Sequence, residues 1–301
     1  MRTDSFALLV WLALLILPVH LFSDNADNKL IDRIYTETSL YRFRTADSLI
    51  KANENRCKSN PTFHLAVINY YWWKLISGQQ NAVYAKKITE RIELVARNNK
   101  VNSQISDHEL FVLISIYAFQ ARVSLKDHAY FSALSALSTY YSIIKQSFGR
   151  EYRYSPFLLT SGLYQFFSGL ARDRYPIFSP LLNQFASGNM KLGLYYLGNA
   201  SLSDDMKIKQ EAEYFLMKIH FDIHHDYKEA EKYCQLLIKK YPDNLLFQYY
   251  LFKIWLASGQ VAKATDQIEV LERLSKRNPQ LTPDEKRYFV DESLKELNKR
   301  N

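Results

Sequence analysis

Residues 211–244 read EAEYFLMKIHFDIHHDYKEAEKYCQLLIKKYPDN, and residues 245–279 read LLFQYYLFKIWLASGQVAKATDQIEVLERLSKRNP. Shifted by 34 positions, the first segment matches the second at four positions that matter for packing: Phe221 with Trp255, His225 with Gly259, Tyr227 with Val261 and Ala230 with Ala264. A bulky ring closes one helix onto its partner, a turn residue follows, and a small residue lets the two helices approach closely. The period therefore predicts repeated helix–turn–helix units.

The composition favours an all-helical protein. The chain has 301 residues but only 8 Gly and 8 Pro, too few to supply the turns of a β-sandwich or barrel of this length. Lys and Arg are interleaved with Asp and Glu, so the formal net charge of +8 predicts a solvated basic surface. No recognisable nucleic-acid-binding module accompanies that charge, and we expect no nucleic-acid partner.

Residues 1–23 have the pattern of a secretory signal peptide. Arg2 precedes an apolar run, Phe6–Leu17, and the chain becomes polar at Ser23. We expect this segment to be cleaved and the protein to be exported to the periplasm or cell envelope. The alternative is an uncleaved anchor, since the apolar stretch reaches the short limit for a membrane span. Contact with a membrane is expected only in that case.

The rest of the chain divides into four helical regions. Residues 24–150 form degenerate helix–turn–helix repeats, and residues 151–203 form an irregular helical insertion rich in Gly and Pro. Residues 204–281 hold the two regular repeats, and residues 282–301 form a C-terminal capping helix. Apolar spacing predicts one helix over Ile31–Ile50. Capping boxes that pair Ser106 with Glu109 and Thr282 with Glu285 predict two further helix starts.

The two cysteines, Cys57 and Cys234, lie far apart in the sequence. One long-range disulfide is possible in an exported protein. We favour two unpaired buried thiols, because residues so distant along a stack of repeats rarely meet.

The chain resembles the tetratricopeptide-repeat (TPR) family, specifically over about 211–278 and loosely over about 29–147. It also resembles the short exported TPR proteins of Bacteroidota, through its N-terminal apolar segment and the phrase NYYWWKLISG at residues 69–78. The resemblance implies an α-solenoid, a right-handed superhelix of antiparallel helix pairs whose concave face binds peptides or protein partners.

Signals for catalysis, metals and cofactors are weak. No nucleophile, phosphate-loop or dinucleotide-binding motif occurs in the sequence, so we expect no catalytic residue, no cofactor and no enzyme activity. His220 and His224 share a helix face, as paired zinc ligands do, but no Glu stands between them. We interpret these two residues and His225 as a solvated helix end, with no metal.

Four consecutive aromatic residues, Tyr70, Tyr71, Trp72 and Trp73, cannot share one face of a helix. Packing between repeats is the simpler interpretation, and a stacking platform for carbohydrate or peptide is the alternative.

The candidate binding residues lie in the two regular repeats. The first helices of successive repeats line one concave surface, which would present Phe215 and Asp222 from one repeat and Tyr249 and Lys253 from the next. Tyr249 and Lys253 are four positions apart and share a face. An aromatic plate beside a cation suits an extended peptide that carries a carboxylate. The alternative is that the C-terminal helix covers the same residues.

The sequence therefore predicts an exported scaffold of the bacterial envelope that binds a partner protein or peptide on its concave face. The alternative is a small-ligand or glycan-binding protein with an aromatic pocket around residues 151–203. A deep, closed pocket there would favour the alternative, whereas an open groove along the repeats would favour the scaffold.

Overall fold

The computed structural model describes residues 19–78, 81–98, 105–126, 138–174 and 183–299. In this part of the chain there are thirteen helical elements and no strand, which confirms the all-helical prediction. The elements are α2 (Val19–Ser39), α3 (Phe43–Asn53), α4 (Pro61–Ile76), α5 (Asn81–Asn98), α6 (Asp107–Lys126), α8 (Phe157–Arg174), α10 (Met190–Ala200), α11 (Met206–Lys218), η2 (Ile219–His224), α12 (Tyr227–Lys240), α13 (Leu245–Ala257), α14 (Val261–Arg277) and α15 (Pro283–Asn298).

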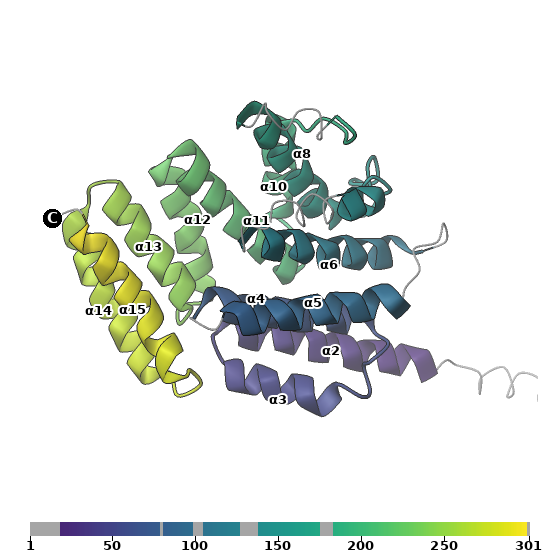
Figure 1. The fold of residues 1–301 in the computed structure, drawn as a ribbon, viewed down its shortest axis with the longest axis horizontal. Helices are drawn as coiled ribbons and strands as arrows, with labels where there is room; N and C mark the ends of the chain where they lie inside the picture. The colour runs from purple at the N-terminus through teal and green to yellow at the C-terminus, as the bar shows by residue number, and fades with distance from the viewer. Residues whose placement is uncertain (1–18, 79–80, 99–104, 127–137, 175–182, 300–301) are drawn as a thin grey trace, which may run out of the picture.

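The two regular repeats have corresponding helix boundaries. α12 begins at Tyr227 and α14 begins at Val261, 34 positions later. α11 packs on α12 as α13 packs on α14, and Ala230 and Ala264 are both completely buried. Neighbouring helices lie side by side from α11 to α15 (Figure 1), an arrangement compatible with a helical solenoid.

The helix starts were well predicted where a cap was present. Ser106 and Glu109 form the predicted reciprocal cap before α6. Thr282 and Glu285 do the same for α15, which begins at Pro283. Polar side chains thus satisfy backbone N–H groups that have no partner within the helix.

The single helix expected over Ile31–Ile50 is instead two helices. α2 ends at Ser39, and Tyr41 takes a left-handed φ of 58° before α3 begins. Because α2 and α3 both bury residues in the same core, the apolar spacing continues across the break between them. The prediction of a single helix was wrong for this reason. Residues 1–18 of the expected signal segment lie outside the described residues, and the expected boundary at residue 23 falls within α2.

The α2–α3 connection lies against the C-terminal repeats. Gln210, Asn244 and Asn278 are spaced 34 positions apart, and each bonds this connection. Gln210 Nε2 donates to Ser39 Oγ (2.9 Å), Asn244 Nδ2 to Ser39 O (2.7 Å) and Asn278 Nδ2 to Tyr41 O (3.1 Å). Three residues at 34-residue spacing therefore hold the same N-terminal segment, Gln210 from within α11 and the two asparagines from helix ends.

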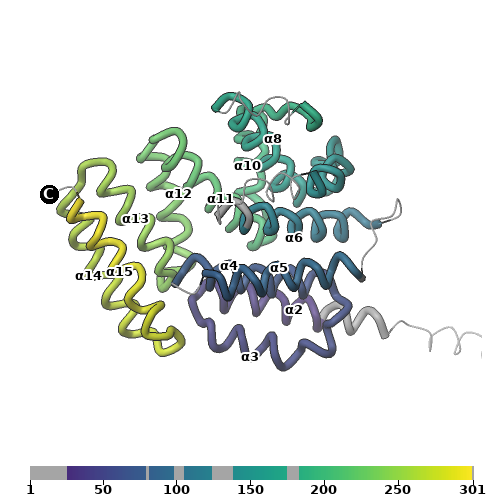
Figure 2. The backbone as a smooth tube through the Cα atoms, viewed as in Figure 1, coloured from purple at the N-terminus to yellow at the C-terminus, as the bar shows by residue number. Residues whose placement is uncertain are grey.

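The largest hydrophobic cluster also joins the two ends of the chain. It runs from Ile31 to Trp73 and from Met217 to Val290, with few residues from the middle of the sequence. Figure 2 shows the N-terminal helices beside the C-terminal helices α14 and α15. In an open stack each repeat touches only its neighbours, so this closure of the first helices onto the last was not expected.

Both cysteines belong to that cluster. Cys57 and Cys234 are buried and carry free thiols, which confirms the prediction of two unpaired buried thiols. Burial raises the pKa of each thiol above its ordinary value, which keeps both groups neutral.

The region over 151–203, expected to be an irregular insertion, contains a close helix pair. α8 and α10 pack along each other, and a Cβ built on Gly193 would lie 2.5 Å from the Phe166 backbone nitrogen. A Cβ on Gly162 would lie 3.1 Å from the Leu197 backbone nitrogen. The glycines of this region therefore allow two backbones to touch.

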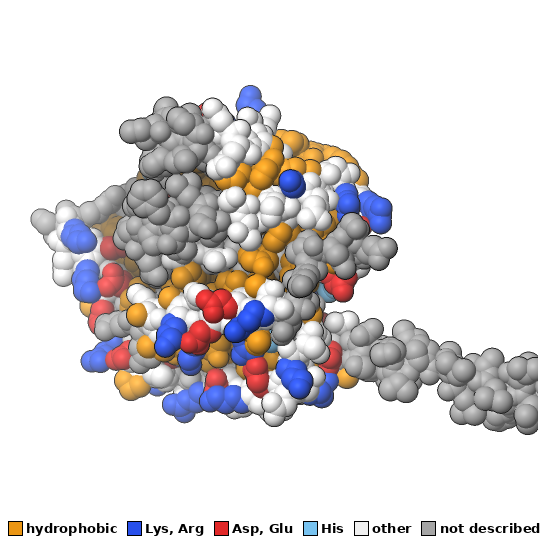
Figure 3. All heavy atoms as spheres, turned by 45° about the vertical axis from the view of Figure 1, so that its right-hand side comes forward, with side chains coloured by type: hydrophobic (Ala, Val, Ile, Leu, Met, Phe, Trp, Pro, Cys, Tyr) orange, Lys and Arg blue, Asp and Glu red, His pale blue; other side chains and the backbone are white. Residues whose placement is uncertain are grey.

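Figure 3 shows a face on which Lys and Arg alternate with Asp and Glu at the level of α2 and α3. Within the described residues, no helix has the length and apolar character needed to cross a membrane.

Candidate binding surfaces

The predicted residue Phe215 lies away from the other three candidates. Its half-buried ring sits 4.8 Å from the Arg122 guanidinium carbon of α6 and 6.3 Å from the Phe167 ring of α8. Arg122 in turn forms an ion pair with Glu211 at 3.7 Å. Phe215 therefore takes part in the junction between α11 and the helices before it.

Asp222 and Lys253 are linked through two residues that the sequence did not single out. Lys218 Nζ donates to Asp222 Oδ2 and to Tyr250 Oη, both at 2.7 Å. Lys253 Nζ lies 5.6 Å from the centre of the same Tyr250 ring. Tyr250 was missed because its neighbour Tyr249 has the same residue type, and only the helix orientation distinguishes them.

The Lys253 ammonium is held among three aromatic rings. It lies 5.3 Å from the Phe221 ring and 5.7 Å from the Tyr249 ring, besides the contact with Tyr250. The side chain is half-buried, and it forms no ion pair with a described residue. Such rings stabilise a cation without neutralising it, so three N–H donors stay available for an anion.

Tyr249 is partly covered by the C-terminal helix. Its hydroxyl donates to Glu296 Oε1 (2.6 Å), and its ring lies 5.2 Å from Phe289 of α15. Burial and the adjacent Glu296 carboxylate raise the pKa of Tyr249 above its ordinary range. Its hydroxyl is therefore already engaged, and the nearby side chains that reach solvent are the exposed Asp222 and the half-buried Lys218 and Lys253. We call these three residues with Tyr250 and Phe221 the lysine–aromatic face.

A second surface is an open groove of about 610 Å³ between the end of α10, α11 and α12. Three apolar side chains in it are exposed, Leu202 by 77%, Met206 by 44% and Leu236 by 45%. Lysines of α11 and α12 surround them: Lys209, Lys232, Lys239 and Lys240. We call this surface the α10–α12 groove.

Two buried ionisable groups lie at the α10–α12 groove. Glu213 is 4% exposed, and burial raises the pKa of its carboxyl, an effect that the nearby Lys209 and Lys240 oppose. The Lys240 ammonium is shielded from solvent and has no hydrogen-bond acceptor among the described residues. Its nearest aromatic contact is the Tyr241 ring at 5.1 Å, and burial lowers the pKa of the ammonium.

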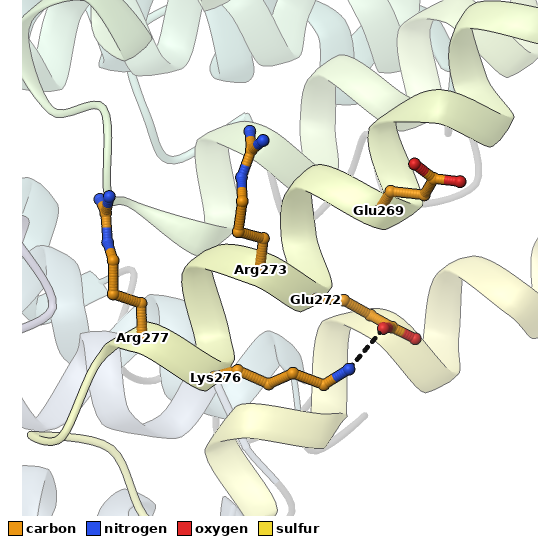
Figure 4. Close-up of a pocket in the computed structure, with 5 residues that line it drawn as sticks. All are labelled: Glu269, Glu272, Arg273, Lys276 and Arg277. Atoms are coloured by element: carbon orange, nitrogen blue, oxygen red, sulfur yellow. Dashed lines mark hydrogen bonds and ion pairs between the residues drawn. The ribbon is translucent and has the colours of Figure 1, made fainter.

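The outer face of α14 carries a shallow charged depression (Figure 4). Arg273 and Arg277 extend in the same direction, while Lys276 reaches Glu272 at 2.7 Å. Arg277 also pairs with Asp243 at 2.8 Å. Because two glutamates share the depression with three basic side chains, two of which are ion-paired, this depression is an ordinary solvated helix face.

The histidines occupy the turn of the first regular repeat. The His220 and His224 rings lie 5.6 Å apart, and the His220 ring stacks on Tyr233. His225 ends the π-helical turn η2 with a left-handed φ of 55°. Within the described residues, no group of three or more His, Cys, Asp or Glu side chains is close enough to hold a metal ion.

The aromatic run in α4 divides between two cores. Tyr70 and Trp73 are buried in the cluster that joins the chain ends, while half-buried Tyr71 and Trp72 pack against the next cluster. Trp72 lies 5.9 Å from Phe119 of α6. All four side chains therefore contribute to packing between helices.

The 151–203 region contributes only its end to the α10–α12 groove, through Gly198, Ser201 and Leu202. That groove is open, and the described residues that line it are mainly lysines and aliphatic side chains, with Tyr233 as the one aromatic residue. No protein-family model matches the chain, and neither a curated protein nor a solved structure matches it.

Proposed function

We propose that this chain is an exported, TPR-like scaffold of the bacterial envelope that binds an extended segment of a partner protein on its lysine–aromatic face. The helix pairs would form a right-handed superhelix, as the resemblance to the TPR family implies. The chain acts by binding and carries no catalytic residue or cofactor. Nucleic acid is not its partner, because basic and acidic residues alternate along the sequence.

The observation that carries this proposal is the unpaired Lys253 ammonium among the rings of Phe221, Tyr249 and Tyr250. A half-buried cation loses part of its hydration, and a carboxylate from a partner would restore hydrogen bonds to it. Phe221 and Tyr250 are buried, so the half-buried Tyr249 ring is the one that offers apolar contact, with few rotatable bonds to immobilise. A peptide carboxylate beside an apolar side chain fits both features.

The test uses a photo-crosslinking amino acid at Asp222, which is exposed beside Lys218. In the cells that produce the protein, we expect one discrete protein adduct, identified by mass spectrometry. Lys253→Glu should abolish the adduct, because it places a negative charge among the rings. The matched control is Lys263→Glu, since Lys263 also lies over a ring, Trp255 at 5.6 Å, but on the outer face of α14.

An adduct that persists unchanged in Lys253→Glu, or that Lys263→Glu removes equally, would exclude the lysine–aromatic face as the binding site. Export has a separate test, because intact-mass measurement of natively produced protein shows whether residues 1–23 are absent. A chain that still begins at Met1 would make the N-terminal segment an anchor and bring the scaffold to the membrane.

The alternative, a glycan-binding protein, has one supporting feature. Tyr152 and Tyr195 are exposed by 79% and 56%, and their hydroxyls interact. Exposed tyrosine rings can stack on sugars. Glycan-array binding that Tyr195→Ala abolishes, with no protein adduct at Asp222, would favour this function over the scaffold.

A further inference from the structure

The α10–α12 groove combines exposed apolar side chains with lysines from two helices. Single exposed apolar residues are common on protein surfaces. Here Leu202, Met206 and Leu236 are exposed within one groove, and Leu202 is 77% exposed. Apolar surface gathered in a groove and rimmed by polar residues is typical of an interaction site.

The charges of the groove are not balanced by the described residues. Lys209, Lys239 and Lys240 form no ion pair there, whereas Lys232 pairs with Glu229 at 2.8 Å. The one carboxyl that lines the groove, Glu213, is buried, and its pKa is raised by that burial. The groove therefore presents a positive field to a ligand.

The spacing of these residues describes the ligand. Leu236 and Lys240 are four positions apart on α12, and Met206 and Lys209 are three apart on α11. Each helix thus places an apolar side chain and an ammonium on one face. The complement of two such faces is a helix with an apolar stripe and acidic residues beside it.

We propose that the α10–α12 groove binds an acidic, amphipathic helical segment of a partner protein. Its apolar stripe would cover Leu202, Met206 and Leu236, while its carboxylates pair with Lys209, Lys239 and Lys240. The Lys240 ammonium, which is shielded from solvent and has no acceptor among the described residues, would turn toward the groove to gain one. Such a charge-assisted bond is stronger than a neutral one.

This inference goes beyond the proposed function, because the groove and the lysine–aromatic face lie on opposite sides of α11. Lys209 precedes Lys218, the last residue of the same helix, by nine positions. At about 100° per residue, nine positions turn the helix by two and a half turns. The two surfaces therefore bind independently, and each has its own test.

The first experiment selects binders from a random peptide library against the purified full chain. We expect enriched peptides with apolar residues at helical spacing and an excess of Asp and Glu. The same selection against the double variant Leu236→Ser, Lys239→Glu should lose this enrichment. Both side chains are exposed, so the double variant should keep its fold, which circular dichroism and melting temperature verify.

The second experiment titrates a fluorescent consensus peptide. The double variant should bind about tenfold or more weakly, and added salt should weaken binding to the parent. The matched control is Leu294→Ser, Lys86→Glu, which alters an equally exposed leucine and a lysine on α15 and α5. This control should bind as the parent does.

Three results would overturn the proposal. The first is that the enriched peptides lack acidic residues. The second is that a peptide with Lys in place of each acidic residue binds equally well, and the third is that the double variant binds like the parent. Vesicles of phosphatidylglycerol provide a further arm, because an anionic membrane also suits lysines and apolar residues. If the double variant loses binding to the vesicles and not to the peptides, the groove recognises lipid and the proposal fails.

Discussion

His225 and Gly259 are 34 positions apart and share a left-handed backbone conformation, with φ of 55° and 81°. Each residue follows the first helix of a regular repeat and precedes the second. The shared conformation supports the repeat alignment more strongly than residue identity does, because His and Gly have no chemical likeness. The turn geometry is thus preserved where the side chain is not.

We predict that Gly259→Ala lowers the free energy of unfolding by about 1–2 kcal/mol. A Cβ at Gly259 would meet no heavy atom within 4 Å, so the cost comes from φ rather than from a clash. Gly198→Ala is the matched control, because its Cβ also meets nothing within 4 Å and its φ is not left-handed. Because Gly198 lies within α10, Gly198→Ala should raise the free energy of unfolding by about 0.5–1 kcal/mol. Urea denaturation gives both values, and the same sign for both would contradict the argument.

Asn244 is a second position where backbone geometry and long-range contact coincide. Its Oδ1 caps α13 by accepting from Phe247 N (3.1 Å), while its Nδ2 donates to Ser39 O. Asn244→Asp preserves the cap but places a carboxylate against a buried carbonyl oxygen. We expect Asn244→Asp to lower the free energy of unfolding by about 2–4 kcal/mol.

The control for this prediction is Asn189→Asp. Asn189 caps α10 in the same way, accepting from Leu192 N (3.0 Å), but it is exposed. There the substitution should leave the free energy of unfolding unchanged or raise it by about 0.5 kcal/mol, because the new carboxylate faces the positive end of a helix. If both substitutions have equal effects in thermal unfolding, Asn244 does not hold the α2–α3 connection.

Glu213 predicts how stability depends on pH. Its folded pKa is raised by burial, so the folded state binds the proton more strongly than the unfolded state does. The contribution of Glu213 to stability is therefore most favourable below its unfolded pKa and is lost as pH rises through its folded pKa. Glu213→Gln should raise the melting temperature at pH 7 and have a smaller effect near pH 4, at about the unfolded pKa. If the gain in melting temperature of Glu213→Gln grew as the pH fell, the folded pKa of Glu213 would not be raised.

The regular repeats could be predicted because a 34-residue period leaves several matching positions, such as Ala230 and Ala264. The closure of the N-terminal helices onto the C-terminal helices could not be predicted. The hydrogen bond between Asn278 and the Tyr41 carbonyl, for example, joins two segments that share no sequence pattern. The four candidate residues predicted from the sequence do not all lie at one place in the structure. Asp222 and Lys253 are linked through Lys218 and Tyr250, whereas Phe215 faces α6, since the rotation of each helix about its axis depends on neighbours that spacing does not reveal.

The α10–α12 groove had no sequence signal. Leu236 and Lys240 look like parts of an ordinary amphipathic helix, and Leu202 lies in the short connection after α10. Only the packing of α10 beside α11 brings these side chains into one groove. A local pattern therefore predicts which helices form, whereas the surface between helices depends on their assembly.

The closure of the N-terminal helices onto the C-terminal helix also depends on a buried ion pair. Lys74 of α4 pairs with Glu285 of α15, and their side chains are 8% and 6% exposed. The Glu285 carboxylate also accepts from Thr282 N (2.9 Å), so one group caps α15 and neutralises Lys74. The Lys74 ammonium lies 4.9 Å from the Phe43 ring, which offers it no countercharge.

We predict that Glu285→Gln destabilises the protein by about 3–5 kcal/mol, because the cap acceptor stays while a buried ammonium loses its partner. Lys74→Met should cost a similar amount by leaving the carboxylate unpaired. The double variant should be far more stable than the sum of the two losses predicts, since no buried charge is left alone. Urea denaturation of the four proteins measures this coupling. The exposed pair Lys276–Glu272, with side chains 75% and 45% exposed, is the control and should couple by about 0.5 kcal/mol or less. Additive losses at Lys74 and Glu285 would show that α15 is held on α4 by apolar packing alone.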